Sequence, residues 1–70
     1  MPSGPLTMFG KTVRELRKAR GLTQEDLAEM AHLHRNYVSD VERGTRNISL
    51  LNILQLARAL GVKPAKLFNW

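Results

Sequence analysis

The segment from Gly21 to Gly44, GLTQEDLAEMAHLHRNYVSDVERG, decides the fold. Near its start, the Thr23 hydroxyl can accept a hydrogen bond from a first-turn amide, and Asp26 three residues later completes a weaker form of the capping box. Apolar positions at helical spacing lie on both sides of the break His32-Leu33-His34. They are Leu27, Ala28 and Ala31 before the break, and Val38 and Val41 after it. The pattern predicts two short helices joined by a tight turn, which is the helix-turn-helix layout.

The flanking sequence predicts three more helices. Residues 8–20 carry apolar side chains at helical spacing, and Gly21 ends this helix as a C′ glycine does. Ser49 can cap a helix that runs to Leu60. Pro64 suits the first position of a short fifth helix that ends near Trp70. The predicted fold class is therefore all-α, a compact domain of five helices.

The size of the chain, 70 residues, allows one domain with a limited core. Residues 1–7 hold two prolines and a glycine and are expected to form a flexible N-terminal arm before a folded domain at residues 8–70. There is no cysteine, which excludes disulfides and thiolate zinc sites. No apolar run approaches the roughly 18 residues of a membrane span, and no signal-peptide pattern opens the sequence. We expect a cytoplasmic protein.

The net charge of +5 is unevenly distributed. Residues 1–42 carry six basic and six acidic side chains, whereas residues 43–70 carry five basic side chains and no acid. A positive half can be attracted to a polyphosphate such as nucleic acid. Solubility explains the excess equally well, so charge alone leaves the partner open.

The polar face of the predicted helix 35–43 is more informative. At about 100° per residue, Val38 and Val41 project to one side, and five hydrogen-bonding side chains spread over the other. These are Arg35, Asn36, Ser39, Asp40 and Arg43. Arginine can bind guanine O6 and N7, and asparagine can bind adenine N6 and N7. Arg35 and Asn36 lie at the N-terminal end, which approaches base edges when such a helix docks in the major groove. The alternative is an ordinary solvated helix face.

Two stretches of the sequence resemble a known family. GLTQEDLA (21–28) and YVSDVERG (37–44) are similar to the Cro/CI-type (XRE) helix-turn-helix family, and RNYVS…ERGTRN (35–47) resembles the controller proteins of restriction–modification systems. The resemblance covers about residues 9–68. It implies a lambda-repressor-like fold and a sequence-specific DNA-binding transcriptional regulator. It also implies that a homodimer reads a palindromic operator through helix 35–43.

The resemblance further implies a role for single residues. Arg17 and Glu42 match a buried ion pair between the first and third helices, although Arg17 alone reads as a solvated base. Base contacts are implied for Arg35 and Asn36, with Ser39 and Asp40 on the same surface. Contacts with DNA phosphates are implied for Gln24, Tyr37, Arg43, Arg46 and Asn47. Tyr37 can alternatively pack on the edge of the domain.

Three residues depart from the family pattern. His32 stands where a turn glycine is usual, and His34 and Lys63 replace the usual caps of the third and fifth helices. Histidine at a positive φ is tolerated at some cost in strain, and a cation at a helix N-terminus opposes the helix dipole. Two histidines without a cysteine or a third histidine make a poor metal site, so neither metal nor cofactor is expected.

The predicted helix 50–60 is more apolar than one core requires. An inward stripe is formed by Ile53, Leu56, Ala57 and Leu60. Leu50, Leu51 and Leu54 widen the apolar arc to about 220°, against the roughly 100° typical of a surface helix. The surplus can meet the fifth helix, at Leu67, Phe68 and Trp70, or a second copy of the chain. The resemblance favours a dimer whose interface contains Leu50, Leu51, Leu54 and Trp70.

The same sequence bears on other functions and partners. There is no nucleophile–base pair, phosphate-binding glycine loop or metal-ligand set, so no enzymatic activity is expected. An antitoxin, or another protein-interaction module with this fold, remains the alternative. In phage repressors that resemble this chain, acids in the second helix touch RNA polymerase, which makes Glu25 and Glu29 candidate polymerase contacts. The simpler interpretation is that these acids suit the start of a helix.

Overall fold

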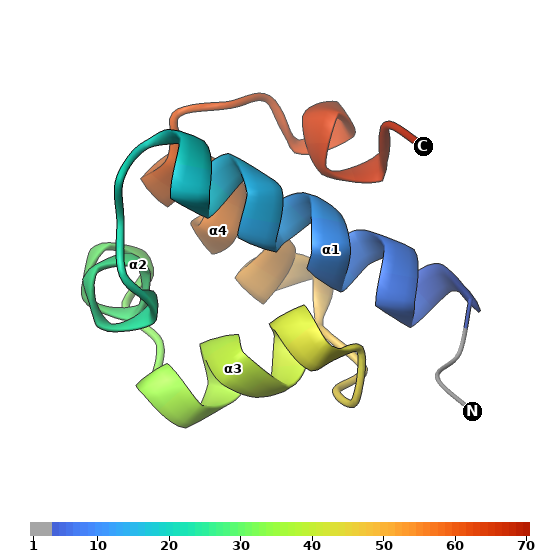
Figure 1. Cartoon of the computed structure of the whole chain (residues 1–70), viewed down its shortest axis with the longest axis horizontal. Coiled ribbons are helices and arrows are strands. Elements are labelled where there is room, and N and C mark those ends of the chain that lie inside the picture. Colours follow the sequence, from blue (N-terminus) through green and yellow to red (C-terminus); the bar gives the residue numbers. More distant parts are fainter. Residues whose placement is uncertain (1–3) are drawn as a thin grey trace.

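The computed structural model describes residues 4–70, which form four α-helices and a short 3₁₀-helix (Figure 1). The elements are α1 (Gly4–Ala19), α2 (Gln24–Ala31), α3 (Arg35–Arg43), α4 (Leu50–Leu60) and η1 (Pro64–Phe68). No strand occurs within residues 4–70, so the all-α prediction is correct. Over the same residues, no helix combines the length and the apolar character that crossing a membrane requires.

The start of α1 differs from the prediction. The helix begins at Gly4, so residues 4–7 of the expected flexible arm are helical, while the rest of that arm lies outside the described residues. Proline is compatible with the first turn of a helix, because its missing N–H has no intrahelical partner there, and Pro5 occupies such a position. The turn is also packed: a Cβ built on Gly44 would lie 2.9 Å from the Cα of Thr7.

The predicted fifth helix is a 3₁₀-helix rather than an α-helix. It comprises Pro64–Phe68, and its first turn closes with a hydrogen bond of 2.9 Å from the Lys66 amide to the Lys63 carbonyl. Lys63 provides no side-chain cap, and a segment of one or two turns is the usual length of a 3₁₀-helix. Leu67 anchors it, since this side chain is fully buried.

The helices enclose one core. α1 packs on α3, α2 contacts both α3 and α4, and η1 lies against α1 and α4. In Figure 1, α1 and α3 run across the view while α2 is seen nearly end-on beside them. The largest fully buried side chains come from every element: Val13, Leu27, Val38, Val41, Leu56, Leu60 and Leu67.

The seam between α1 and α3 depends on a glycine. A Cβ built on Gly10 would overlap the carbonyl oxygen of Val41 and would lie 2.8 Å from that of Glu42. The two helix backbones are therefore in direct contact, and no side chain fits between them. This close approach sets the position of α3 against the core, and with it the direction of its outer face.

Side-chain caps begin α2 and α4, as predicted. The Asp26 amide donates to the Thr23 hydroxyl, and the Thr23 amide donates to the Asp26 carboxylate, each at 3.0 Å. The second of these bonds is the main reason that the pKa of Asp26 lies below its ordinary value. At α4, the Asn52 amide donates to the Ser49 hydroxyl at 3.2 Å. These caps define where the two helices start.

Candidate nucleic-acid interface

The turn between α2 and α3 contains the two histidines that replace usual residues. His32 has φ 59° and ψ 42°, which is the left-handed conformation. The Leu33 amide donates to the Ala28 carbonyl at 2.8 Å and closes the end of α2. His34 occupies the N-cap position of α3 in an extended conformation and forms no side-chain cap. The turn is therefore tight but contains one strained residue and one missing cap.

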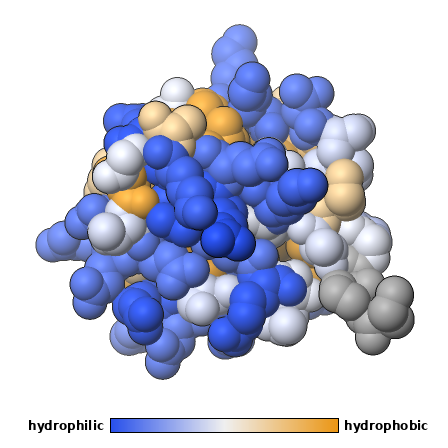
Figure 2. Space-filling model, in the orientation of Figure 1, coloured by the Kyte–Doolittle hydropathy of each residue, from blue (hydrophilic) through white to orange (hydrophobic). Residues whose placement is uncertain are grey.

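The outer face of α3 is polar, as the helical spacing predicts. Val38 and Val41 are buried, and Arg35 and Asn36 are exposed at the N-terminal end. Ser39 and Asp40 are half-buried, and Arg43 is exposed. Figure 2 shows that hydrophilic residues cover most of this side of the molecule, including the region where Figure 1 places α3. The five predicted side chains thus share one accessible surface.

Three charged side chains on this surface are linked to one another. The Asp40 carboxylate forms an ion pair with Arg43 through Oδ1 and another with Arg46 through Oδ2, the latter at 3.3 Å. The guanidinium of Arg46 also lies over the ring of Tyr37, 4.7 Å from its centroid. We call Tyr37, Asp40, Arg43 and Arg46 the Asp40 cluster. Tyr37 is half-buried, so it both packs on the domain edge and supports a basic side chain.

Asp40 also holds the loop after α3 in place, through its backbone. The backbone carbonyl of Asp40 accepts hydrogen bonds from the Thr45 amide at 3.0 Å and from the Thr45 hydroxyl at 3.1 Å. Asn47, another predicted phosphate contact, is exposed on this loop. Three of the predicted phosphate contacts therefore lie at the C-terminal end of α3 (Arg43) and in the loop that follows it (Arg46 and Asn47).

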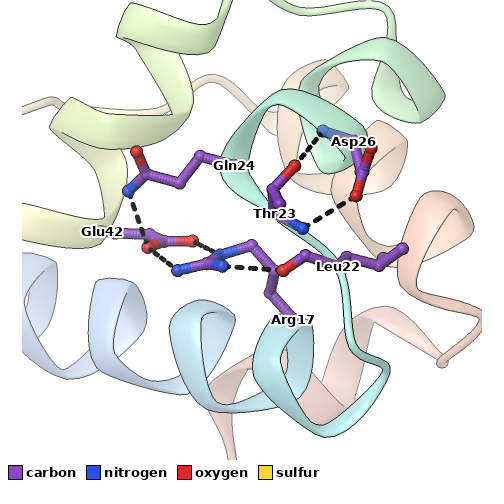
Figure 3. A network of polar contacts seen from close by, with 6 residues as sticks. All are labelled: Arg17, Leu22, Thr23, Gln24, Asp26 and Glu42. Atoms are coloured by element: carbon purple, nitrogen blue, oxygen red, sulfur yellow. Dashed lines mark hydrogen bonds and ion pairs between the residues drawn. The ribbon is translucent and has the colours of Figure 1, made fainter.

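A buried polar network ties α3 to α1 and α2 (Figure 3). Arg17 binds Glu42 twice, through Nε to Oε2 at 2.6 Å and through Nη2 to Oε1 at 3.0 Å. Its Nη1 donates to the Leu22 carbonyl at 2.8 Å. The side chains of Arg17 and Glu42 are only 10% and 3% exposed. The hydrogen bond with Glu42 raises the pKa of Arg17 above its ordinary value, so the guanidinium stays charged. The structure thus brings together the two residues of the predicted ion pair.

Gln24 belongs to this buried network. Its Nε2 donates to Glu42 Oε1 at 3.0 Å, so Glu42 accepts three hydrogen bonds in all. A side-chain amide has two N–H groups, and the network uses one of them. Because Gln24 is half-buried at the first position of α2, its second N–H is compatible with the predicted phosphate contact.

The apolar surplus of α4 is not covered by the chain itself. Leu50, Leu51 and Leu54 are 71%, 66% and 44% exposed. Trp70 is 53% exposed and lies against Phe68, whose ring contacts that of Phe9 in turn. A groove runs beside these aromatic rings, lined by Pro5, Leu6, Phe9, Asn47, Ile48, Ile53, Phe68 and Trp70. Of the two alternatives for the leucines, packing under the fifth helix is therefore not what the structure shows.

Some contacts that position this surface were not anticipated. The close approach of α1 to α3 at Gly10 was not predicted, because the position of a glycine in a sequence does not reveal what faces it. It also missed Arg20, whose Nη1 donates to the Leu60 carbonyl at 2.7 Å and satisfies the end of α4. Within residues 4–70, no group of three or more His, Asp or Glu side chains is arranged to hold a metal ion.

The chain matches proteins of known family over most of its length. The model of a helix-turn-helix family matches residues 13–67. The control protein C.BamHI of Bacillus amyloliquefaciens is 48% identical over 64 residues, which are 90% of this chain and 79% of that protein. The controller protein C.AhdI of Aeromonas hydrophila, a solved structure, is 55% identical with a TM-score of 0.93 and covers 94% of this chain and 100% of its own.

A further solved structure contains DNA. The restriction–modification controller protein C.Esp1396I has been solved as a tetramer in complex with its natural 35-base-pair operator. It is 32% identical to this chain with a TM-score of 0.87, and the match covers 94% of this chain and 87% of that one. These matches confirm the resemblance on which the residue roles depended. The chain belongs to the Cro/CI-type (XRE) helix-turn-helix family and is similar to its restriction–modification controller proteins.

Proposed function

We propose that this protein is a sequence-specific transcriptional regulator that reads a palindromic operator as a homodimer, with α3 in the major groove. The observation that carries the proposal is the outer face of α3, where Arg35 and Asn36 are exposed at the end of the helix that approaches base edges in this docking mode. The similarity to controller proteins, one of them bound to its operator, supports it. Its place would be the cytoplasm, in association with the nucleoid.

The proposal divides the surface between reading and positioning. Arg35, Asn36 and Ser39 have the exposure and chemistry to contact base edges. Phosphate contacts that fix its register suit side chains of α3, of the start of α2 and of the loop after α3, namely Tyr37, Arg43, Gln24, Arg46 and Asn47. Asp40 lies on the same face of α3, and each of its carboxylate oxygens is already paired, one with Arg43 and the other with Arg46.

Selection of bound sequences from a random DNA pool tests the proposal directly. We expect a palindrome whose half-sites lie about one helical turn apart, because a two-fold dimer presents α3 to successive major grooves. Arg35→Ala should cost about 1–3 kcal/mol of binding free energy and relax the preference at one guanine-containing position. Failure to enrich any sequence would refute the proposal. Equal losses on operator and random DNA would make Arg35 a phosphate contact.

The homodimer rests on the exposed leucines of α4. Fully burying one leucine contributes on the order of 1.5–3 kcal/mol, and a symmetric interface uses each residue twice. Leu50, Leu51 and Leu54 are exposed on α4, and Ile53 of the same helix lines the aromatic groove together with Trp70. The patch is small, and we therefore propose a reversible dimer that DNA binding strengthens.

Leu54→Glu tests the dimer, with Met30→Glu as the matched control. The two side chains are similarly exposed, 44% and 40%, but Met30 lies on α2. Sedimentation should show a folded monomer for Leu54→Glu, with weakened operator binding, and wild-type behaviour for Met30→Glu. A wild-type protein that stays monomeric at high concentration and binds its site as a single copy would rule out the dimer.

A second proposal concerns RNA polymerase. Glu25 and Glu29 are exposed on α2, the helix that also carries Gln24, so they are accessible to a neighbouring protein. Reversing both charges should abolish activation in a reconstituted transcription assay and leave operator binding unchanged. Unchanged transcription would show that these acids are structural or only face solvent.

The antitoxin alternative makes a different prediction. Stable association with a toxin in place of operator DNA would favour it.

A further inference from the structure

The two acids of α3 have different surroundings. Glu42 is enclosed by Arg17 and Gln24 and is withdrawn from the surface. Asp40 is 28% exposed on the side that carries Arg35, Asn36 and Arg43. Glu42 is the last acid of the sequence, because residues 43–70 contain only basic charged side chains. Asp40 is therefore an anion on a surface whose proposed partner is a polyanion. The repulsion between the two disfavours DNA binding, so the presence of Asp40 there calls for an explanation.

The geometry of Asp40 shows what it does in the free protein. Each of its carboxylate oxygens holds a different arginine, Oδ1 that of Arg43 and Oδ2 that of Arg46. Arg46 is additionally confined by the Tyr37 ring beneath its guanidinium. Its loop is pinned by two hydrogen bonds from Thr45 to the Asp40 carbonyl. Two long side chains, 63% and 46% exposed, are thus kept in one arrangement.

This arrangement has unequal consequences for different DNA sequences. A guanidinium has five N–H donors, so an arginine paired with Asp40 can still donate to a phosphate that lies in the right place. An operator held in register by base contacts presents phosphates at fixed places. Non-cognate DNA is bound through phosphates alone, in many registers, and gains most from arginines that are free to move.

We propose that Asp40 is a specificity-determining, positioning residue, which holds Arg43 and Arg46 in the arrangement that suits the operator and so limits binding to non-cognate DNA. It acts through the two arginines and makes no base contact. The inference rests on the proposed function, since it requires an operator. It assigns the acid on the DNA-binding face a role that differs from the base contact predicted from sequence.

The test compares Asp40→Asn with Glu15→Gln on selected operator and random duplex. Both variants remove one negative charge, but Glu15 is exposed on α1 and forms no part of the proposed interface. For Asp40→Asn, we expect affinity for random duplex to rise about three- to tenfold, with a salt dependence steeper by up to about one unit. Operator affinity should change little, so the ratio of the two affinities falls. Asp40→Glu should restore much of that ratio.

A second arm shows whether Asp40 acts through the arginines. In a protein that already carries Arg43→Ala and Arg46→Ala, Asp40→Asn should no longer alter the ratio. Three results would overturn the inference. One is a loss of operator affinity and of preference at one base pair with random binding unchanged, which would make Asp40 a base contact. Another is an equal rise on both DNAs that Glu15→Gln reproduces, and the third is a change that persists without the arginines.

The design separates this inference from the function on which it rests. If the wild-type protein shows no preference for any duplex, the proposed function fails. If the wild-type protein prefers its operator and Asp40→Asn behaves as Glu15→Gln does, only the role of Asp40 fails. Thermal unfolding of each variant confirms that the proteins compared are folded.

Discussion

Asp40 and Glu42 are two residues apart on α3, and each binds arginine, yet they serve different parts of the molecule. Glu42 faces inward and joins α3 to α1 and α2 through Arg17 and Gln24 (Figure 3). Asp40 faces outward and pairs with Arg43 and Arg46, which are both exposed. The same pairing of a carboxylate with arginine therefore joins helices inside the domain and holds exposed arginines on its surface.

Solvent accounts for the difference. A surface ion pair contributes about 0–1 kcal/mol, because water and salt screen it and two long side chains must be ordered. Removing one partner of a buried pair costs about 3–5 kcal/mol, because the other charge is left without compensation. The inner pair, Arg17 with Glu42, should therefore mainly affect folding stability. The outer pairs of Asp40 with Arg43 and Arg46 should mainly affect DNA binding by the folded protein.

The largest expected effect is that of Glu42→Ala. This substitution leaves Arg17, whose side chain is 10% exposed, without its carboxylate and should cost about 3–5 kcal/mol of unfolding free energy. In so small a domain, that loss can unfold the protein, so Glu42→Gln provides a milder variant. Denaturant unfolding measures the effect, with Asp40→Ala as the control. Equal costs for the two alanine variants would remove the distinction between the pairs.

The second-largest expected effect concerns the seam between α1 and α3, and it involves no charged residue. Gly10→Ala places a methyl group against the carbonyl of Val41 and should cost about 1–3 kcal/mol through forced separation of α1 and α3. The sign is diagnostic, because alanine in an unhindered helix is favoured over glycine by about 1 kcal/mol. Gly4→Ala is the control, since its Cβ would meet no atom within 4 Å. A stabilised Gly10→Ala protein would show that the seam can open freely.

The sequence predicted most of what local chemistry determines. Thr23, Ser49 and the apolar spacing located α2, α3 and α4, because caps and periodicity act over a few residues. The first turn of α1 was missed, since Pro5 reads as part of an arm until its packing neighbours are known. The type of η1 was missed because five residues fit either kind of helix.

The candidate site was only partly predictable. The helix period placed Arg35, Asn36 and Asp40 on one face, but it could not reveal that Arg46, in a loop, folds back onto Tyr37 and Asp40. The pairing of Arg17 with Glu42 spans 25 positions and followed from family resemblance alone. Contacts between distant segments depend on how helices pack, which no single-sequence pattern contains.

The third effect concerns the outer pair and DNA. Arg46→Ala should weaken binding to operator and random duplex alike, by on the order of 1 kcal/mol, and make the salt dependence about one unit shallower. Unfolding free energy should change by less than about 1 kcal/mol, because the Arg46 ion pair is at the surface. Lys66→Ala, an exposed base on η1, is the control. An unchanged salt slope would show that Arg46 does not reach a phosphate.

The smallest effect separates the two pairs most cleanly. Asp40→Asn should lower the unfolding free energy by no more than about 0.5–1 kcal/mol at low salt. At 1 M salt the Debye length is about 3 Å, so the exposed pairs with Arg43 and Arg46 are screened and the difference from wild type should vanish. Glu42→Gln should retain its full cost at that salt, because its network is closed to ions. Denaturant unfolding at two salt concentrations gives all four values. If the cost of Asp40→Asn persists at 1 M salt, Asp40 stabilises α3 through hydrogen bonds rather than charge. The Asp40 cluster would then contribute to folding in the same way as the network around Glu42.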